Sequence, residues 1–297
     1  MCGLFGYQSA SGKMPGAAVA VAVMACRMDD RGGDSFGYMA DGAITRGLGT
    51  ISAGDVPAAR LGAVTTLMAH TRNATTGAVS VENAHPFSIG RIVGAHNGIV
   101  FNHADLNRTL GRDCAVDSMH IFQSLSESRS LSEIQAYGAI TFVNARRPRR
   151  LYLGRFNHGQ LSVARLFNGP KSKARVAGIM WASTRDALVA SLSLSDSRYD
   201  MVEIENGTLY RVQGGEIYRH GKIAISAAPV KKVATIPKHA TMLPGLAALE
   251  ARATTVHILA GPAFRANFDA DSPPLAALGP GDPVFHQGRW VGNWPDE

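Results

Sequence analysis

The chain has 297 residues, 45% of them hydrophobic and 18% charged, with a net charge of +7 at pH 7, which is the composition of a globular protein with a substantial core. No stretch reaches the roughly 18 consecutive apolar residues of a membrane-spanning helix, and the first residues lack the pattern of a secretion signal. The positive charge would permit a nucleic-acid partner, but no aromatic-rich binding strand, helix-turn-helix signature or zinc finger accompanies it, so we expect a cytoplasmic protein without a nucleic-acid or membrane partner.

Short apolar runs recur along the chain and predict β-strands, whereas three longer stretches predict helices. In chain order, the expected strands are 4–7, 36–39, 64–69, 92–95, 139–143, 161–166, 176–181 and 208–212. The expected helices are 17–28, 118–125 and 184–193. Many strands with few helices indicate two sheets packed on each other and covered by helices, which is an α+β layered domain.

Two segments stand apart from this pattern. Residues 146–150 (RRPRR) join two strand-like segments and are interpreted as a solvated hairpin tip, since runs of like charge are usually solvated. From about residue 227 the sequence becomes rich in proline and alanine and its periodicity weakens. We therefore expect one domain over residues 2–225 and a C-terminal extension over 226–297, which ends in a small hairpin around Gln287-Gly288.

The chain has three cysteines, Cys2, Cys26 and Cys114, and no C-x-x-C pair, so neither a disulfide framework nor a metal site is predicted. Cys26 lies in an expected helix and is interpreted as a core residue, while Cys114 lies in a polar loop. Cys2 differs because removal of Met1 would place its thiol beside a free α-amine. Their ordinary pKa values, about 8.5 and about 7.7–8.0, allow the amine to take the thiol proton.

Five ordered blocks of residues follow one another in the first third of the chain. They are 2–6 (CGLFG), 31–37 (RGGDSFG), 70–77 (HTRNATTG), 82–87 (ENAHPF) and 96–102 (HNGIVFN). In order and approximate spacing, these blocks and Asp117 resemble the class II glutamine amidotransferase domain of the N-terminal-nucleophile hydrolases, and a weaker likeness continues to about Arg219. The resemblance implies a four-layer αββα fold, in which two sheets lie between layers of helices.

The resemblance also implies catalytic roles. Cys2 is then the nucleophile, and its own α-amine is the general base. Asn97 and the backbone N–H of Gly98 form the oxyanion hole, where charge develops on the amide oxygen during attack. A glycine after Asn97 also lets the backbone direct its N–H inward.

Three further residues are implied to bind the substrate. Arg72 would bind the α-carboxylate of glutamine, a task that suits a planar group donating two parallel hydrogen bonds. Asp117 would accept from the α-ammonium group, and Thr75 would help to position the substrate. Together they would select a free amino acid over a peptide.

Each of these residues has a simpler interpretation when it is taken alone. Asn97-Gly98 is a common turn dipeptide, Arg72 is typical of a surface charge, and Asp117 is typical of a helix N-cap, a role it could combine with substrate binding. Asn73 stands where synthases of the class usually carry an aromatic residue. Three histidines match the blocks but are expected to be structural, because the base role is already filled: His70, His85 and His96.

The sequence therefore predicts a glutamine amidotransferase subunit that converts L-glutamine to glutamate and ammonia through a Cys2 thioester, without a cofactor or metal. Because residues 226–297 lack a phosphate loop, a phosphoribosyl-binding signature and a sugar-isomerase pattern, we expect the ammonia acceptor to be a separate synthase protein. Two alternatives stay open. One is a stand-alone amidohydrolase acting on a γ-glutamyl compound or another small amide, and the other is a non-catalytic binding or assembly subunit.

Overall fold

The computed structural model describes residues 2–12, 14, 16–52, 58–169, 174–194 and 198–223, together with the backbone of 283–286 and 289–293. The chain divides into two compact units, Met1–Ser226 and Ala227–Glu297. In the second unit, β14 (Pro283–His286) and β15 (Arg289–Asn293) pair as an antiparallel two-stranded sheet. The remainder of the expected C-terminal extension, including Gln287-Gly288, lies outside the described residues.

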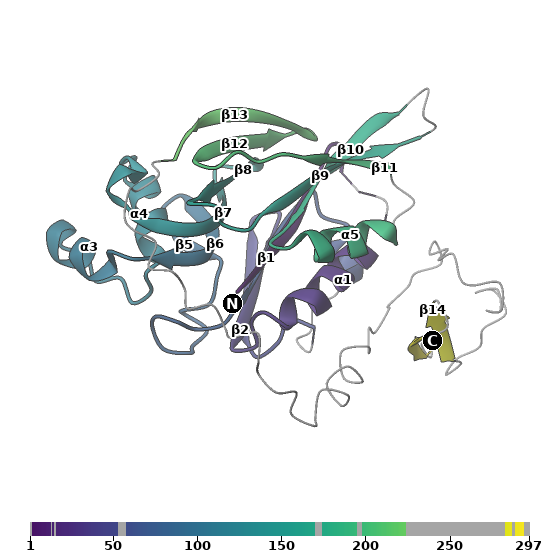
Figure 1. The fold of residues 1–297 in the computed structure, drawn as a ribbon, viewed down its shortest axis with the longest axis horizontal. Coiled ribbons are helices and arrows are strands. Elements are labelled where there is room, and N and C mark those ends of the chain that lie inside the picture. Colours follow the sequence, from purple (N-terminus) through teal and green to yellow (C-terminus); the bar gives the residue numbers. More distant parts are fainter. Residues whose placement is uncertain are drawn as a thin grey trace, which may run out of the picture. The chain divides into compact units, whose positions relative to one another are not determined.

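Two antiparallel sheets form the first unit, as Figure 1 shows. Within the described residues, the first sheet has the order β11 (Arg198–Val202), β9 (Ser162–Asn168), β10 (Arg175–Ala182), β1 (Gly3–Ser9), β4 (Thr66–Arg72), β2 (Ser35–Ala40) and β3 (Ala43–Leu48). The second has the order β13 (Glu216–Lys222), β12 (Thr208–Gln213), β8 (Arg147–Phe156), β7 (Ala136–Asn144), β6 (Ile92–Val100) and β5 (Phe87–Ile89). The expected fold of mixed sheet and helix is confirmed at this level.

Helices cover the outer faces of both sheets. On the first sheet lie α1 (Ala17–Asp29) and α5 (Arg185–Ser193), which pack against each other, and on the second lies α4 (Met119–Ser126) (Figure 1). The buried residues of α1 recur every three or four positions, which gives the helix one apolar face toward the sheet. Shorter helical segments connect the strands: α2 (Ala58–Leu61), α3 (His103–Leu110) and η1 (Leu131–Glu133).

Strand β1 lies in the middle of the first sheet, and both of its faces are buried. Successive side chains of a strand point to opposite faces. Phe5 and Tyr7 accordingly pack in the core beneath α1 and α5, while Leu4 packs with Trp181 in the core between the two sheets. The alternation places Cys2, two residues before Leu4, on the side that faces the second sheet.

The described residues contain all eight expected strands and all three expected helices, with shifted ends. The strand expected over 92–95 continues to Val100, since β6 pairs with β7 along its whole length. The strands β3 and β13 and the helix α3 were not expected. None of the residues of β3 or β13 is buried, and in α3 only Leu106 is. None of the described helices is long and apolar enough to span a membrane.

Candidate active site

Cys2 lies immediately before β1, in a half-buried position. Its Sγ atom is 3.4 Å from the backbone N of Asn73 and 3.5 Å from the backbone O of the same residue. The Arg31 guanidinium fixes the Cys2 backbone from the other side, since its Nε donates to the Cys2 carbonyl at 2.9 Å. The thiol is therefore held between the end of β4 and the loop before β2.

Burial raises the pKa of the Cys2 thiol above its ordinary value. The hydrogen bond from the Asn73 backbone and the positive charge of Arg72 oppose this rise, while the negative charge of Asp117 adds to it. The thiol is thus protonated at neutral pH and needs a base to become a nucleophile. The same charges show that Arg72 and Asp117 lie within electrostatic reach of Cys2.

Asn97 is connected to the start of β1 through Ser183. The Asn97 Nδ2 donates to Ser183 Oγ at 2.7 Å, and Ser183 Oγ accepts from the backbone N of Leu4 at 2.8 Å. The backbone N of Ser183 in turn donates to the Leu4 carbonyl at 2.7 Å. A side-chain amide has two N–H donors, so this bond orients the Asn97 amide and leaves its second N–H for a ligand.

Gly98 lies inside β6 opposite Gly138 of β7, so Asn97-Gly98 is part of a strand and the turn alternative is excluded. A Cβ atom at position 98 would collide with the carbonyl oxygen of Tyr137 and lie 2.5 Å from the His96 Nε2. Glycine is required here by the close approach of β7.

Arg72 ends β4 with 2% of its surface exposed, so the alternative of a surface charge is also excluded. Its guanidinium donates to the carbonyl oxygens of Thr76 at 2.5 Å and Ala78 at 3.2 Å, and thereby closes the loop that follows β4. Asp34 supports this loop from outside, since its Oδ2 accepts from the Ala74 backbone N at 2.8 Å. Thr75 is exposed on the same loop.

Asp117 is 3% exposed and binds the end of β6, where its Oδ2 accepts from the Val100 backbone N at 2.6 Å. It does not cap α4, because the residue before that helix is Ser118 and no side-chain cap bond is present there. The carboxylate therefore lies at the end of β6, the strand that also carries Asn97 and Gly98.

Three buried histidines surround this region. The rings of His70 and His85 lie 4.1 Å apart, and neither has a hydrogen-bond partner for its ring nitrogens among the described residues. His96 contacts Ser118 Oγ at 2.9 Å and Tyr137 O at 3.1 Å. Burial lowers the pKa of all three, that of His70 to about 3, so they are neutral at physiological pH.

The other two cysteines lie in different surroundings. Cys26 is half-buried on α1 rather than a full core residue. Cys114 is buried, and its thiol contacts Gln123 Oε1 at 3.3 Å. In the part of the chain that the structure describes, no three His, Cys, Asp or Glu side chains gather closely enough to hold a metal ion.

Three residues that contribute to the site had no role assigned from the sequence: Arg31, Asp34 and Ser183. Arg31 and Asp34 belong to the block 31–37, and Ser183 follows β10. Their partners lie 29 to 179 positions away along the chain. Membership of a matching block was the only signal in the sequence that pointed to the first two.

No family model matches the chain. Over 130 residues it is 38% identical to a glutamine–fructose-6-phosphate aminotransferase [isomerizing] of Mycolicibacterium paratuberculosis, a match that covers 38% of this chain and 19% of that protein. The fold is similar to that of the allosteric regulatory enzyme of purine biosynthesis, with a TM-score of 0.54 and 18% identity, and to that of glutamine phosphoribosylpyrophosphate amidotransferase from B. subtilis, with a TM-score of 0.51 and 17% identity. Both structural matches cover 76% of this chain and 50% of the other chain, so the likeness spans only part of each relative.

Proposed function

We propose that this chain carries a class II glutamine amidotransferase domain and that it hydrolyses L-glutamine to glutamate and ammonia with Cys2 as the nucleophile. The observation that carries the proposal is the assembly around Cys2. Asn97 is linked to the start of β1 through Ser183, and Arg72 and Asp117 lie within electrostatic reach of the thiol. We also assign the covered sheets to the four-layer αββα sandwich, and residues 2–225 to the catalytic domain.

The first step requires a base for the Cys2 proton. Burial holds the pKa of the thiol above its ordinary value, and the nearby histidines have pKa values too low for efficient proton uptake at neutral pH. Removal of Met1 supplies the base, since the α-amine of Cys2 has an ordinary pKa of about 7.7–8.0. The thiolate then adds to the carboxamide carbon of glutamine.

Asn97 and Gly98 stabilise the negative charge that forms on the amide oxygen. The second N–H of the Asn97 amide and the backbone N–H of Gly98 are the proposed donors, and the Ser183 bond fixes the amide before substrate arrives. Donors that are oriented in advance need no reorganisation during the reaction, which is the main source of their effect.

Recognition of free glutamine falls to Arg72, Thr75 and Asp117. The guanidinium has five N–H donors, so its bonds to the loop carbonyls leave donors for an α-carboxylate. The bond from Val100 uses one oxygen of Asp117 and leaves the other for the α-ammonium group. Opposite charges at two fixed positions select a zwitterionic amino acid.

Collapse of the tetrahedral intermediate breaks the C–N bond, and the nitrogen leaves as ammonia with the proton that the α-amine took. Water then adds to the γ-glutamyl thioester, the C–S bond breaks, and glutamate and the Cys2 thiol are released. The aminotransferase that the chain resembles is named for glutamine and fructose-6-phosphate. We propose that the ammonia made here is likewise used by an acceptor synthase.

A glutamine hydrolysis assay on Cys2→Ala and on Cys26→Ala tests this function. We expect the first variant to lose at least about 10³-fold in kcat, because it removes the nucleophile, and the second to retain the activity. Mass spectrometry should show Met1 removed in the active protein and a glutamine-like diazo ketone attached to Cys2 alone. Equal labelling of Cys26 and Cys114, or full activity of Cys2→Ala, would overturn the proposal.

A further inference from the structure

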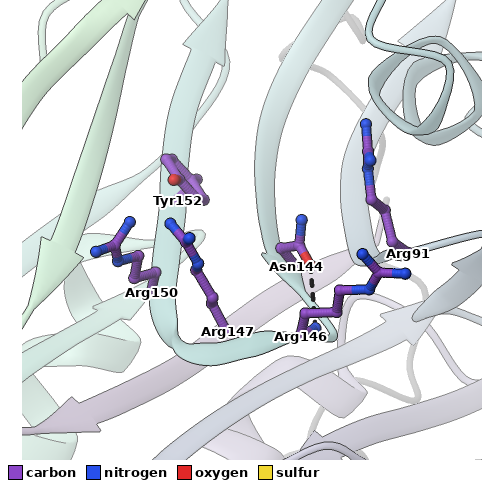
Figure 2. Close-up of a pocket in the computed structure, with 6 residues that line it drawn as sticks. All are labelled: Arg91, Asn144, Arg146, Arg147, Arg150 and Tyr152. Carbon is purple, nitrogen blue, oxygen red and sulfur yellow. Dashed lines mark hydrogen bonds between the residues drawn. The ribbon is translucent and has the colours of Figure 1, made fainter.

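The end of the second sheet farthest from Cys2 carries a pocket of about 240 Å³. Four arginines, one asparagine and one tyrosine line it: Arg91, Asn144, Arg146, Arg147, Arg150 and Tyr152 (Figure 2). Arg91 precedes β6 and lies six residues before Asn97, a separation of about 20 Å in an extended strand. The pocket is therefore distinct from the candidate active site.

An irregularity in the pairing of β7 with β8 turns Arg147 and Arg150 toward this pocket. Residues three apart in a regular strand point to opposite faces, yet Arg147 and Arg150 line the same pocket. The β7–β8 register shifts here: Val143 pairs with Leu151, whereas the next residue, Asn144, pairs with Arg147. A bulge of this kind re-aims side chains. The expected hairpin tip is largely exposed, as predicted, and three of its arginines also line the pocket.

Contacts from other segments hold the bulge in place. The buried Gln8 of the first sheet donates from its Nε2 to the Arg149 carbonyl at 3.0 Å. Within the turn, Asn144 Oδ1 accepts from the Arg146 backbone N at 3.0 Å, and the Ala145 backbone N donates to the Arg91 carbonyl at 2.8 Å. The arginine-bearing backbone is thus fixed before any ligand binds.

Four positively charged side chains line the pocket, and one of them, Arg91, donates to Ser128 Oγ at 2.6 Å. In the described part of the chain, no acidic side chain forms an ion pair with any of the four lining arginines. Figure 2 shows Arg147 and Arg150 beside Tyr152, while Arg146 extends toward Arg91 on the other side of Asn144. Like charges held together repel one another, and an anion that binds between them relieves this repulsion.

We propose that this pocket binds a small molecule that carries a diphosphate group. Guanidinium groups bind phosphate through paired hydrogen bonds, and the combined charge of four lining arginines is closer to that of a diphosphate than to that of a single phosphate. The volume lies below the roughly 300–1,000 Å³ of pockets for drug-sized ligands, which fits a diphosphate with little else enclosed. The Tyr152 ring forms a fixed wall, because it stacks on Phe142 with ring centroids 4.8 Å apart.

Titration calorimetry of the full chain with inorganic pyrophosphate, at an ionic strength of about 0.15 M, tests this site without reference to glutamine hydrolysis. We expect saturable binding at one site and at least tenfold weaker binding of orthophosphate. Arg147→Gln and Arg150→Gln should each weaken pyrophosphate binding about tenfold or more, since each removes charged hydrogen bonds. Competition between a nucleoside diphosphate and pyrophosphate would show that the site accepts a diphosphate group within a larger molecule.

The matched control is Arg149→Gln, because Arg149 belongs to the same basic run and does not line the pocket. We expect this variant to bind pyrophosphate as the unchanged protein does. Equal weakening by Arg149→Gln, or no saturable binding of pyrophosphate, would overturn the proposal. So would tighter binding of a short single-stranded oligonucleotide, which would make this surface a nucleic-acid site.

Discussion

The region around Cys2 and the arginine pocket at the far end of the second sheet treat charge in opposite ways. Around Cys2, the charged groups are buried and bound to backbone atoms: Arg72 to the carbonyls of Thr76 and Ala78, and Asp117 to the N–H of Val100. At the far end, four arginines converge on a pocket without ion pairs among the described residues. A site that must position groups for chemistry fixes its charges in the fold, whereas a site that only binds an anion leaves them for the ligand.

Among variants that test this comparison, we expect Asn97→Ala to have the largest effect on the kcat of glutamine hydrolysis. Loss of one oxyanion-hole donor typically lowers kcat by about 10²–10³, while KM should change less because the donor acts mainly in the transition state. Steady-state kinetics of glutamine hydrolysis measure both. A variant that raised KM and preserved kcat would show that Asn97 binds ground-state glutamine instead.

Arg72→Lys is expected to act on binding. The lysine keeps the positive charge but loses the planar group that donates two parallel bonds, so KM for glutamine should rise about 10- to 100-fold with a smaller change in kcat. Arg46→Lys is the matched control, because Arg46 also donates two bonds to a backbone carbonyl, that of Pro86, at 2.7 and 3.0 Å. If both variants changed KM equally, the effect of Arg72 would be structural.

Local sequence patterns were sufficient to predict a mixed fold of sheets and helices and to find the blocks that carry the resemblance. Apolar alternation located β1, β4 and β6. The order of the blocks indicated a resemblance to the class II glutamine amidotransferase domain, and the chain is 38% identical over 130 residues to a glutamine–fructose-6-phosphate aminotransferase. The roles of Cys2, Arg72, Thr75, Asn97, Gly98 and Asp117 stay predictions until they are tested.

What the sequence could not predict depends on contacts between distant segments. Asn97-Gly98 has the composition of a turn, but pairing of β6 with β7 along nine positions makes it a strand. The charge of Arg72 indicated exposure, but the following loop turns its carbonyls onto the guanidinium. The pocket is lined by Arg91 as well as by arginines of the basic run 146–150. Arg91 lies more than fifty positions before this run, and no local pattern in the run indicated that the two would meet.

The buried neutral histidines near Cys2 make the free energy of unfolding depend on pH. Burial lowers the pKa of His70 to about 3, whereas an unfolded histidine has a pKa of about 6.5. Below pH 6.5 the unfolded state therefore binds a proton that the folded state does not, and the free energy of unfolding falls as the pH falls toward 3. For His70 alone the loss between pH 6.5 and pH 5 is about 2 kcal/mol.

His70→Leu should remove that part of the pH dependence. Denaturant unfolding at pH 7.5 and pH 5 measures it, and we expect the difference between the two pH values to shrink by about 2 kcal/mol in the variant. His158→Asn is the control, because that side chain is exposed and its replacement should leave the difference unchanged. An unaltered difference in His70→Leu would mean that His70 becomes protonated within the folded protein.

The smallest effect concerns Ser183, which we expect to be a positioning residue. Ser183→Ala removes the acceptor that orients the Asn97 amide, so the donor samples other orientations and kcat should fall about tenfold, with less change in KM. Ser183→Thr retains a hydroxyl and should recover most of the activity. The matched control is Ser191→Ala, since Ser191 is also fully buried but donates within α5 to the Leu188 carbonyl. A general loss of stability would lower activity in both alanine variants and would not be rescued by threonine. If instead only Ser183→Ala loses kcat and threonine restores it, the orientation of Asn97 through Ser183 is part of what makes the region around Cys2 a catalytic site.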